Sequence, residues 1–259
     1  MISIYFGDQT WPQLQKAIEA NTLIILPIGQ VEEHGKHLPV STDTVIAEAV
    51  GQRLAEALVS EDLPTLVMPT VWSGYSTKEM TRWPGTMRVR PQVLTDLIYD
   101  ISSSLIEMGF RKIMILTSHG HHTGILRVVV RQIADSYDVY MALVSPATLS
   151  TEQYSQIRRS ERGGSIHGGE WETSLMLYLN EPVDMQQATD EDTMRYHSDF
   201  IAGDNFVGGQ KVFWSTWNVQ KSKTGIYGDP TVATAETGQA TMEAIIANGV
   251  AFAKEFWSA

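Results

Sequence analysis

Residues 23–59 of the chain are LIILPIGQVEEHGKHLPVSTDTVIAEAVGQRLAEALV. The first six residues of this stretch are all apolar, which is typical of a strand buried on both faces of a parallel sheet. From residue 43 to residue 59 the apolar side chains recur at helical spacing, with Ile46, Val50 and Leu54 on one stripe. A polar loop rich in glutamate and histidine joins the two. The stretch therefore predicts a strand, a loop and a helix in succession.

The same alternation continues along the chain. Apolar runs at 66–71, 112–117 and 139–144 predict three further strands, and the patterns at 91–108, 123–137, 170–179 and 235–256 predict helices. We therefore expect an α/β fold with a mostly parallel sheet that helices cover on both faces. Residues 1–259 contain no internal repeat and no linker, so a single domain is expected.

The composition excludes several classes of protein. A formal charge of −11 argues against a nucleic-acid partner, which would need clustered Lys and Arg. The chain has no cysteine, so disulfides and thiolate metal ligands are excluded. The start of the chain lacks a signal-peptide pattern, and the run 23–28 is too short to span a bilayer. We expect a cytoplasmic enzyme or binding protein without a membrane partner.

Six of the seven histidines fall into three short clusters. The clusters are residues 32–37 with the later Asp43, residues 119–122 and residues 167–172; only His197 stands apart. The first two clusters follow predicted strands, and ligands of open α/β sheets bind beyond the carboxyl ends of the strands. Since histidine binds metals and moves protons near neutral pH, one site assembled from three loops is expected.

Two pairs of residues have the spacing of an extended metal-binding loop. Glu32 and His34 are two residues apart, as are His119 and His121, and this spacing places both side chains on the same side of an extended segment. Asp43 lies in line with the apolar stripe of its helix, although helix starts also favour an acid for capping.

Glu172 belongs to the apolar face of its helix, because Leu175, Met176 and Leu179 lie three, four and seven residues further on. A carboxylate that faces the core is costly unless it is paired or bound to a metal. A structural salt bridge to an arginine is the alternative. Glu170 is expected to be solvated.

If Glu32, Asp43 and Glu172 lie in one pocket, these three carboxylates would repel one another without cations. Two divalent ions would bring four positive charges against three negative ones, and the remainder favours a bound hydroxide. Ligands of oxygen and nitrogen without sulfur suit zinc, manganese or a mixture, with iron as a further option. We expect His167 to transfer protons, although it could also be a ligand or a structural histidine. Ser76 and His121 are candidate substrate contacts, and His121 is alternatively a ligand.

At these residues the chain resembles the creatininase (creatinine amidohydrolase) family. The family's hallmark is an apolar strand, then Glu-x-His-Gly-x-His-Leu-Pro and a later Asp, which is similar to residues 26–39 with Asp43. Four other family motifs, Phe-Pro-Gly-Thr, Asn-Gly-His-Gly-Gly-Asn, His-Ala-Gly-x-x-Glu-Thr-Ser and Gly-x-x-Gly-Asp-Pro, resemble residues 83–86, 117–122, 167–174 and 225–230. These matches occur in order along the chain.

The resemblance implies a three-layer αβα fold and a dinuclear metal hydrolase, usually a homo-oligomer and by family resemblance a hexamer. The reaction it implies is hydrolysis of a C–N bond in a small cyclic amide or formamide through a metal-bound hydroxide. It places Glu32, Asp43 and His119 at one ion, and His34, Asp43 and Glu172 at the other.

The chain also departs from the creatininases proper. It has Gly120-His121 where they carry a Tyr-Glu pair, and residues 163–166 are Gly-Gly-Ser-Ile where they carry a Trp-Asp pair. Creatinine is therefore expected to be a poor substrate. The alternatives are hydrolysis of a cyclic ketone or lactone on the same metal site, or metal binding without catalysis. His167 argues against the last, because a pure binding site needs no spare proton carrier.

Overall fold

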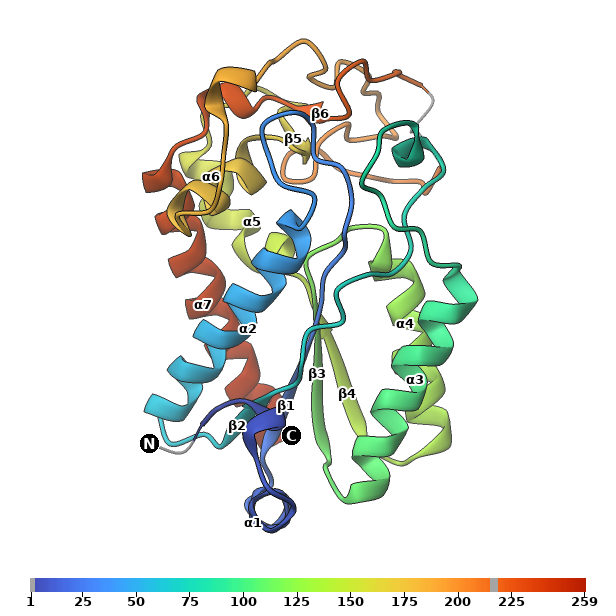
Figure 1. Ribbon diagram of the computed structural model, residues 1–259, viewed down its shortest axis with the longest axis vertical. Coiled ribbons are helices and arrows are strands. Elements are labelled where there is room, and N and C mark those ends of the chain that lie inside the picture. The colour runs from blue at the N-terminus through green and yellow to red at the C-terminus, as the bar shows by residue number, and fades with distance from the viewer. Residues whose placement is uncertain (1–2, 215–218) are drawn as a thin grey trace.

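The protein, seen in a computed structural model that describes residues 3–214 and 219–259, has three layers with a parallel sheet in the middle (Figure 1). The strands have the order β2-β1-β3-β4. They span Leu23–Ile28 (β1), Thr65–Val67 (β2), Lys112–Thr117 (β3) and Tyr140–Val144 (β4). This arrangement confirms the predicted α/β fold with helices on both faces.

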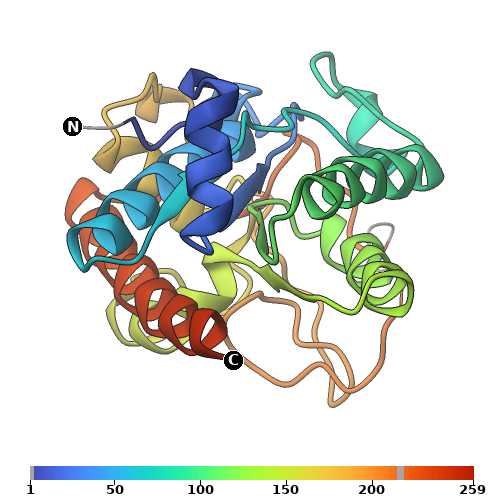
Figure 2. The same cartoon turned by 90° about the horizontal axis from the view of Figure 1, so that it is seen from below.

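Two groups of helices cover the two faces of the sheet. Seen from below in Figure 2, α2 and α7 lie on one side, and α3 and α4 lie on the other. The helices span Trp11–Glu19 (α1), Thr42–Ser60 (α2), Pro91–Met108 (α3), His122–Ser136 (α4), Pro146–Ile157 (α5), Glu170–Tyr178 (α6) and Ala235–Ser258 (α7). No helix in the described part of the chain combines the length and apolar character that crossing a membrane requires.

Strand β1 is the centre of the hydrophobic core. All six of its residues are buried. Because side chains alternate along a strand, Leu23 and Ile25 pack into one apolar cluster with α2, α6 and α7, whereas Ile24, Leu26 and Ile28 pack into a second cluster with α3 and α4. The strand thus joins both layers and holds the start of the Glu32–His34 loop in place.

The predicted second strand is longer than the observed one. It was expected at 66–71, but β2 ends at Val67, and Val71 forms only an isolated bridge with Ile28. Pro69 lacks the backbone N–H that a regular ladder needs, which explains the early end. The chain also forms elements that were not predicted: helices α1 and α5, and an antiparallel pair of Ser165–His167 (β5) with Tyr227–Gly228 (β6).

Loops between α6 and α7 cover the carboxyl end of the sheet, at the top of Figure 1. Two buried aspartates hold them. Asp192 accepts hydrogen bonds from Ser222 Oγ, Lys223 N, Thr224 N and Thr224 Oγ1. Asp204 accepts two bonds from Arg158, at 2.8 and 2.9 Å. This irregular region between α6 and α7 is therefore held in place over the carboxyl end of the sheet.

Candidate active site

The loop between β1 and α2 supplies the first part of the site. Glu32 and His34 are both buried. His34 Nδ1 donates to Glu32 O at 2.9 Å, and this bond leaves Nε2 facing Asp43 Oδ1 at 3.7 Å and Glu172 Oε2 at 3.9 Å. Asp43 lies in the first turn of α2 and is 1% exposed, so it faces the site rather than solvent.

The end of β3 supplies the second part. His119 Nδ1 lies 2.9 Å from Asp43 Oδ2, and His119 Nε2 lies 3.3 Å from Glu32 Oε2. Asp43 therefore lies between His119 and His34, with one carboxylate oxygen toward each. A carboxylate in this position has the geometry to bridge two cations.

The start of α6 supplies the third part. Glu172 Oε2 accepts from Gly168 N at 2.5 Å. Gly168 has a φ of +63°, a conformation that glycine adopts without strain and that turns this N–H toward the carboxylate. Within the described residues Glu172 forms no salt bridge to an arginine. The structure therefore brings together Glu32, His34, Asp43, His119 and Glu172 from three loops.

Several buried ligand atoms of this cluster form no hydrogen bond and face only the charged groups of the cluster itself. Among the described residues, Glu32 Oε2, His34 Nε2 and His119 Nε2 are buried and form no hydrogen bond. A buried polar atom without a partner costs about 1–3 kcal/mol, which a bound cation would offset. Potential ligand atoms within 4.8 Å of one another form two groups, Glu32–His119–His121 and His34–His167–Glu172. The oxygen and nitrogen donors fit zinc or manganese.

The charges of the cluster shift its pKa values strongly. Burial alone would lower the pKa of His34, but Asp43, Glu172 and Glu32 raise it to about 10. Burial would raise the pKa of Asp43, but His119 and His34 hold it below its usual range. Burial raises the pKa of Glu172. A proton on His34 therefore offsets part of the charge of the neighbouring carboxylates.

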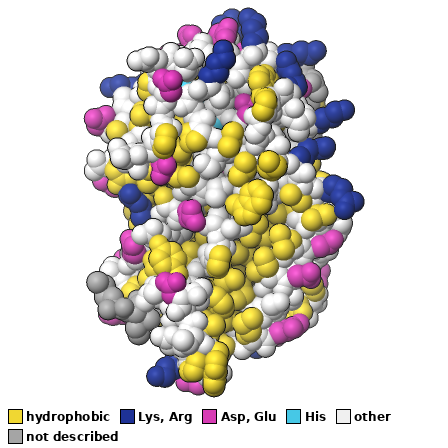
Figure 3. Space-filling model, in the orientation of Figure 1, with side chains coloured by type: hydrophobic (Ala, Val, Ile, Leu, Met, Phe, Trp, Pro, Cys, Tyr) yellow, Lys and Arg dark blue, Asp and Glu magenta, His cyan; other side chains and the backbone are white. Residues whose placement is uncertain are grey.

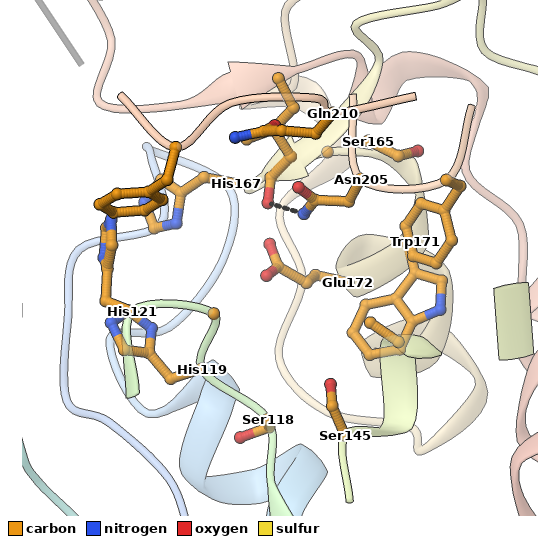
Figure 4. Close-up of a pocket in the computed structure, with 16 residues that line it drawn as sticks. Ser118, His119, His121, Ser145, Ser165, His167, Trp171, Glu172, Asn205 and Gln210 are labelled. Carbon is orange, nitrogen blue, oxygen red and sulfur yellow. Dashed lines mark hydrogen bonds between the residues drawn. The ribbon is translucent and has the colours of Figure 1, made fainter. Parts of the chain in front are cut away.

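His167 lies in β5 at the wall of the same cavity as Glu172 (Figure 4). Its Nε2 donates to Glu33 O at 2.8 Å, and its ring centroid lies 4.4 Å from that of His34. Burial and His34 act to lower the pKa of His167, but hydrogen bonding to Glu33 and nearby carboxylates raise it overall. The ring is thus fixed beside the cluster and can carry a proton.

The cavity beside the cluster has a volume of about 320 Å³. His121 lines it, and burial and His119 lower the pKa of His121 to about 3, so this ring is neutral. The sequence did not single out Asn205 or Gln210, which reach the cavity from the irregular region. They lie in loops without a periodic pattern, so no signal marked them.

One expectation needs correction and one stays a prediction. Ser76 is fully buried and donates to Glu32 Oε1 at 2.9 Å, so its hydroxyl orients Glu32, and its contact with a substrate stays a prediction. Glu170 was expected to be solvated but is fully buried, and it accepts from Arg159 N at 2.8 Å and Ser160 N at 2.7 Å. These bonds to backbone donors stabilise the buried carboxylate.

Comparisons with known proteins agree with this fold. The family model for creatininase, creatinine amidohydrolase, matches residues 7–253. A mycofactocin precursor peptide peptidase of Mycobacterium tuberculosis (strain CDC 1551 / Oshkosh) is 31% identical over 229 residues, which cover 86% of this chain and 81% of the relative. A 3-dehydro-scyllo-inosose hydrolase of Thermotoga maritima is 26% identical over 261 residues, covering 94% and 80% of the two chains.

The solved structures show the same fold. A manganese creatininase superposes with a TM-score of 0.80 at 24% identity, and the match covers 98% of this chain and 99% of the other. A mutant creatininase of Zn-Zn type superposes with a TM-score of 0.78 at 23% identity over 99% of both chains. Because the family model matches nearly the whole length of this chain, the chain belongs to the creatininase family of hydrolases.

Proposed function

We propose that this creatininase-family hydrolase cleaves the C–N bond of an amide at a pair of divalent cations. The observation that carries the proposal is the set of buried ligand atoms that form no hydrogen bond, Glu32 Oε2, His34 Nε2 and His119 Nε2, arranged around Asp43. The manganese and zinc forms of the structural relatives support the same choice of metals. Cations bound there would supply Lewis acidity toward water and toward the carbonyl oxygen of the amide.

The residues divide into two ligand groups with one shared carboxylate. Glu32 and His119 would hold one cation, with His121 within reach of both. His34 and Glu172 would hold the other, and Asp43 would contact both. Ser76 fixes the orientation of Glu32 through its 2.9 Å hydrogen bond.

We assign proton transfer to His167. Amide hydrolysis requires that a proton leave the attacking water and that one reach the departing nitrogen. His167 is buried at the cavity wall, and Glu33 O fixes its ring through a 2.8 Å bond. A histidine held in this position can accept the first proton and donate the second.

Metal analysis combined with a histidine substitution tests the proposal. The purified protein should hold two divalent ions per chain. His167→Ala should keep them and lose about 10²–10⁴-fold in turnover, the usual contribution of a general acid–base group. The exposed His197 offers a matched control, since His197→Ala should change neither quantity. Loss of metal in His167→Ala would make His167 a ligand, and a protein that takes up no metal would refute the proposal.

Membership of the family does not fix which amide is the substrate. The relatives include a peptide peptidase and a hydrolase of an inosose, so the family accommodates different substrates. Creatinine remains a predicted poor substrate, because Gly120 leaves open the space beside the cavity that a tyrosine fills in the creatininases proper. A homo-oligomer and a cytoplasmic location also stay predictions.

A further inference from the structure

A second cavity, larger than the first, adjoins the metal-ligand cluster. Its volume is about 570 Å³, compared with about 320 Å³ for the cavity beside Glu172. The two cavities share part of their walls, so they lie side by side. The shared residues are Gly120, His121, Ile166, Asn205, Gln210 and Phe213. A small cyclic amide would occupy the first cavity and leave the second empty.

The walls of the second cavity are mainly aromatic and aliphatic. Its aromatic residues are Tyr75, Tyr196, Phe213, Trp214 and Tyr227, and the aliphatic ones include Ile125, Met194 and Ile201. Asp204 also lines it, but this carboxylate is already paired with Arg158 through bonds at 2.8 and 2.9 Å. A cavity of this kind binds apolar groups, and aromatic rings in particular, since ring pairs add about 0.5–1.5 kcal/mol to the gain from burial.

Two glycines keep this space open. A Cβ built on Gly120 or on Gly124 would meet no atom within 4 Å. Gly120 lies where both cavities meet, and Gly124 lies on the wall of the second cavity, in the first turns of α4. Side chains larger than a methyl group at these two positions would therefore extend into open space at the edge of the second cavity.

Two polar groups line these cavities as well. Asn205 lies where both cavities meet, and its Nδ2 donates to Ile166 O at 3.0 Å, which orients its carboxamide beside Glu172 (Figure 4). Thr77 Oγ1, on the wall of the second cavity, is buried and forms no hydrogen bond within the described residues. A substrate that carries amide groups along its length would supply partners to both.

We infer that the second cavity is a substrate subsite for a bulky apolar or aromatic group, and that the substrate is an acyl or peptide amide. Its scissile bond would lie between His119 and Glu172, and its side group would extend past Gly120 to Gly124 and Ile125. Water adds across the C–N bond, which yields a carboxylic acid and an amine. This inference rests on the proposed function, because the subsite has a role only if an amide is cleaved beside it.

Binding of two hydroxamates to the metal-loaded protein tests the subsite. Acetohydroxamate and 3-phenylpropionohydroxamate share a metal-binding group. The first carries a methyl group on it, and the second carries a phenylethyl group instead. Burial of the phenyl group should make the second bind about 10- to 100-fold tighter. In Gly124→Leu the added side chain should fill the subsite, and the ratio of the two affinities should fall toward one. Gly124→Ala, which adds one methyl group, is the matched control and should keep most of the ratio.

The possible results distinguish a failure of the proposed function from a failure of the subsite alone. If neither hydroxamate binds and no metal is retained, the proposed function fails. If acetohydroxamate binds but the phenyl group adds no affinity, or if Gly124→Leu leaves the ratio unchanged, the subsite is refuted while the metal site stands. Gly124→Met fills the same space and replaces the leucine variant if that variant does not fold. With matched dipeptides, kcat/KM should favour a phenyl over a methyl side chain in the wild type and lose this preference in the variant.

Discussion

A cation that binds beside Asp43 must displace a proton from His34. The Nε2 atom of His34 lies 3.7 Å from Asp43 Oδ1 and 3.9 Å from Glu172 Oε2. Burial would lower the pKa of His34, yet these carboxylates raise it to about 10. At neutral pH and without metal the ring is therefore protonated, and a metal ion can bind Nε2 only after that proton leaves.

We predict that metal binding releases protons and strengthens as the pH rises. Because the pKa of His34 in the metal-free protein is about 10, protons compete with the cation at every pH below that value. Apparent affinity should rise about tenfold per pH unit for each proton released. Calorimetric titrations in buffers of different ionisation enthalpy measure the number of protons. Heats that do not depend on the buffer near neutral pH would contradict the pKa of His34.

The sequence identified the residues whose neighbours in the chain reveal their position. Glu32, His34 and His119 follow strands, and Glu172 shares a helix face with apolar residues, so local patterns placed them at the site. Ser76 differs, because its role depends on a hydrogen bond to Glu32, which lies 44 residues away. No local pattern contains such a contact.

At the scale of elements, Asp192 fixes the loop that precedes β6. It accepts four hydrogen bonds from residues 222–224. The next residues along the chain lead to Ile226, which is buried and packs against Gly35 and Gly168 beside the ligand cluster. Asp192 is thus connected to the site through a short, rigid segment.

Asp192→Ala should destabilise the fold by about 1–3 kcal/mol, the range for buried donors that lose their acceptor, and should lower kcat/KM as well. Burial acts to raise the pKa of Asp192, but the bonds from Thr224 and its neighbours lower it overall, so the stabilisation is present above the unfolded pKa and is lost as the pH falls. Thermal unfolding measures the effect. Asp184→Ala, which removes an exposed aspartate with one bond to Gln186 N, is the control and should cost much less. Equal losses in both variants would refute the role of Asp192.

Most of the long elements could be predicted, whereas helices α1 and α5 and the short strands β5 and β6 could not. Strands β1 and β3 and helix α3 have the predicted bounds, because apolar runs and periodic stripes mark them. Helix α1 buries no residue fully, and only Leu14, Ala17 and Ile18 pack against the core from it. Strands β5 and β6 have three and two residues and pair over a long stretch of chain, which is too little sequence to form a pattern.

At the scale of the whole molecule, the charges are distributed unevenly. The chain carries a formal charge of −11, yet Lys and Arg side chains gather along the top and right edges of the view in Figure 3, toward the end that holds the loops of the site. The exposed cations on these loops include Lys36, Lys78, Arg82, Arg88, Arg90, Arg162, Arg195, Lys211, Lys221 and Lys223, of which Arg82 pairs with Glu79 and Lys223 with Glu191. Charges grouped around a site raise the local concentration of ligands of opposite sign.

We predict that an anionic amide reacts faster than a neutral amide of equal size, and that the advantage declines as salt is added. The screening length is about 10 Å at 0.1 M salt, so the attraction should largely disappear above that concentration. Values of kcat/KM across a salt series measure the effect. Lys78→Glu should reduce the advantage, whereas Lys16→Glu, on α1 at the opposite end, should not. An advantage that does not respond to salt would refute electrostatic attraction.

The position of β1 has a consequence for how the protein opens. The strand has partners on both edges, and its side chains extend alternately into both apolar clusters. Its amide protons should therefore exchange with solvent only when both layers separate, and so at the slowest rate in the molecule. The loop that carries Glu32 and His34 begins where this strand ends, at Ile28. Fluctuations that loosen the outer helices should consequently leave Glu32 and His34 in place, whereas Asp43 and Glu172 should move with α2 and α6, on which they lie.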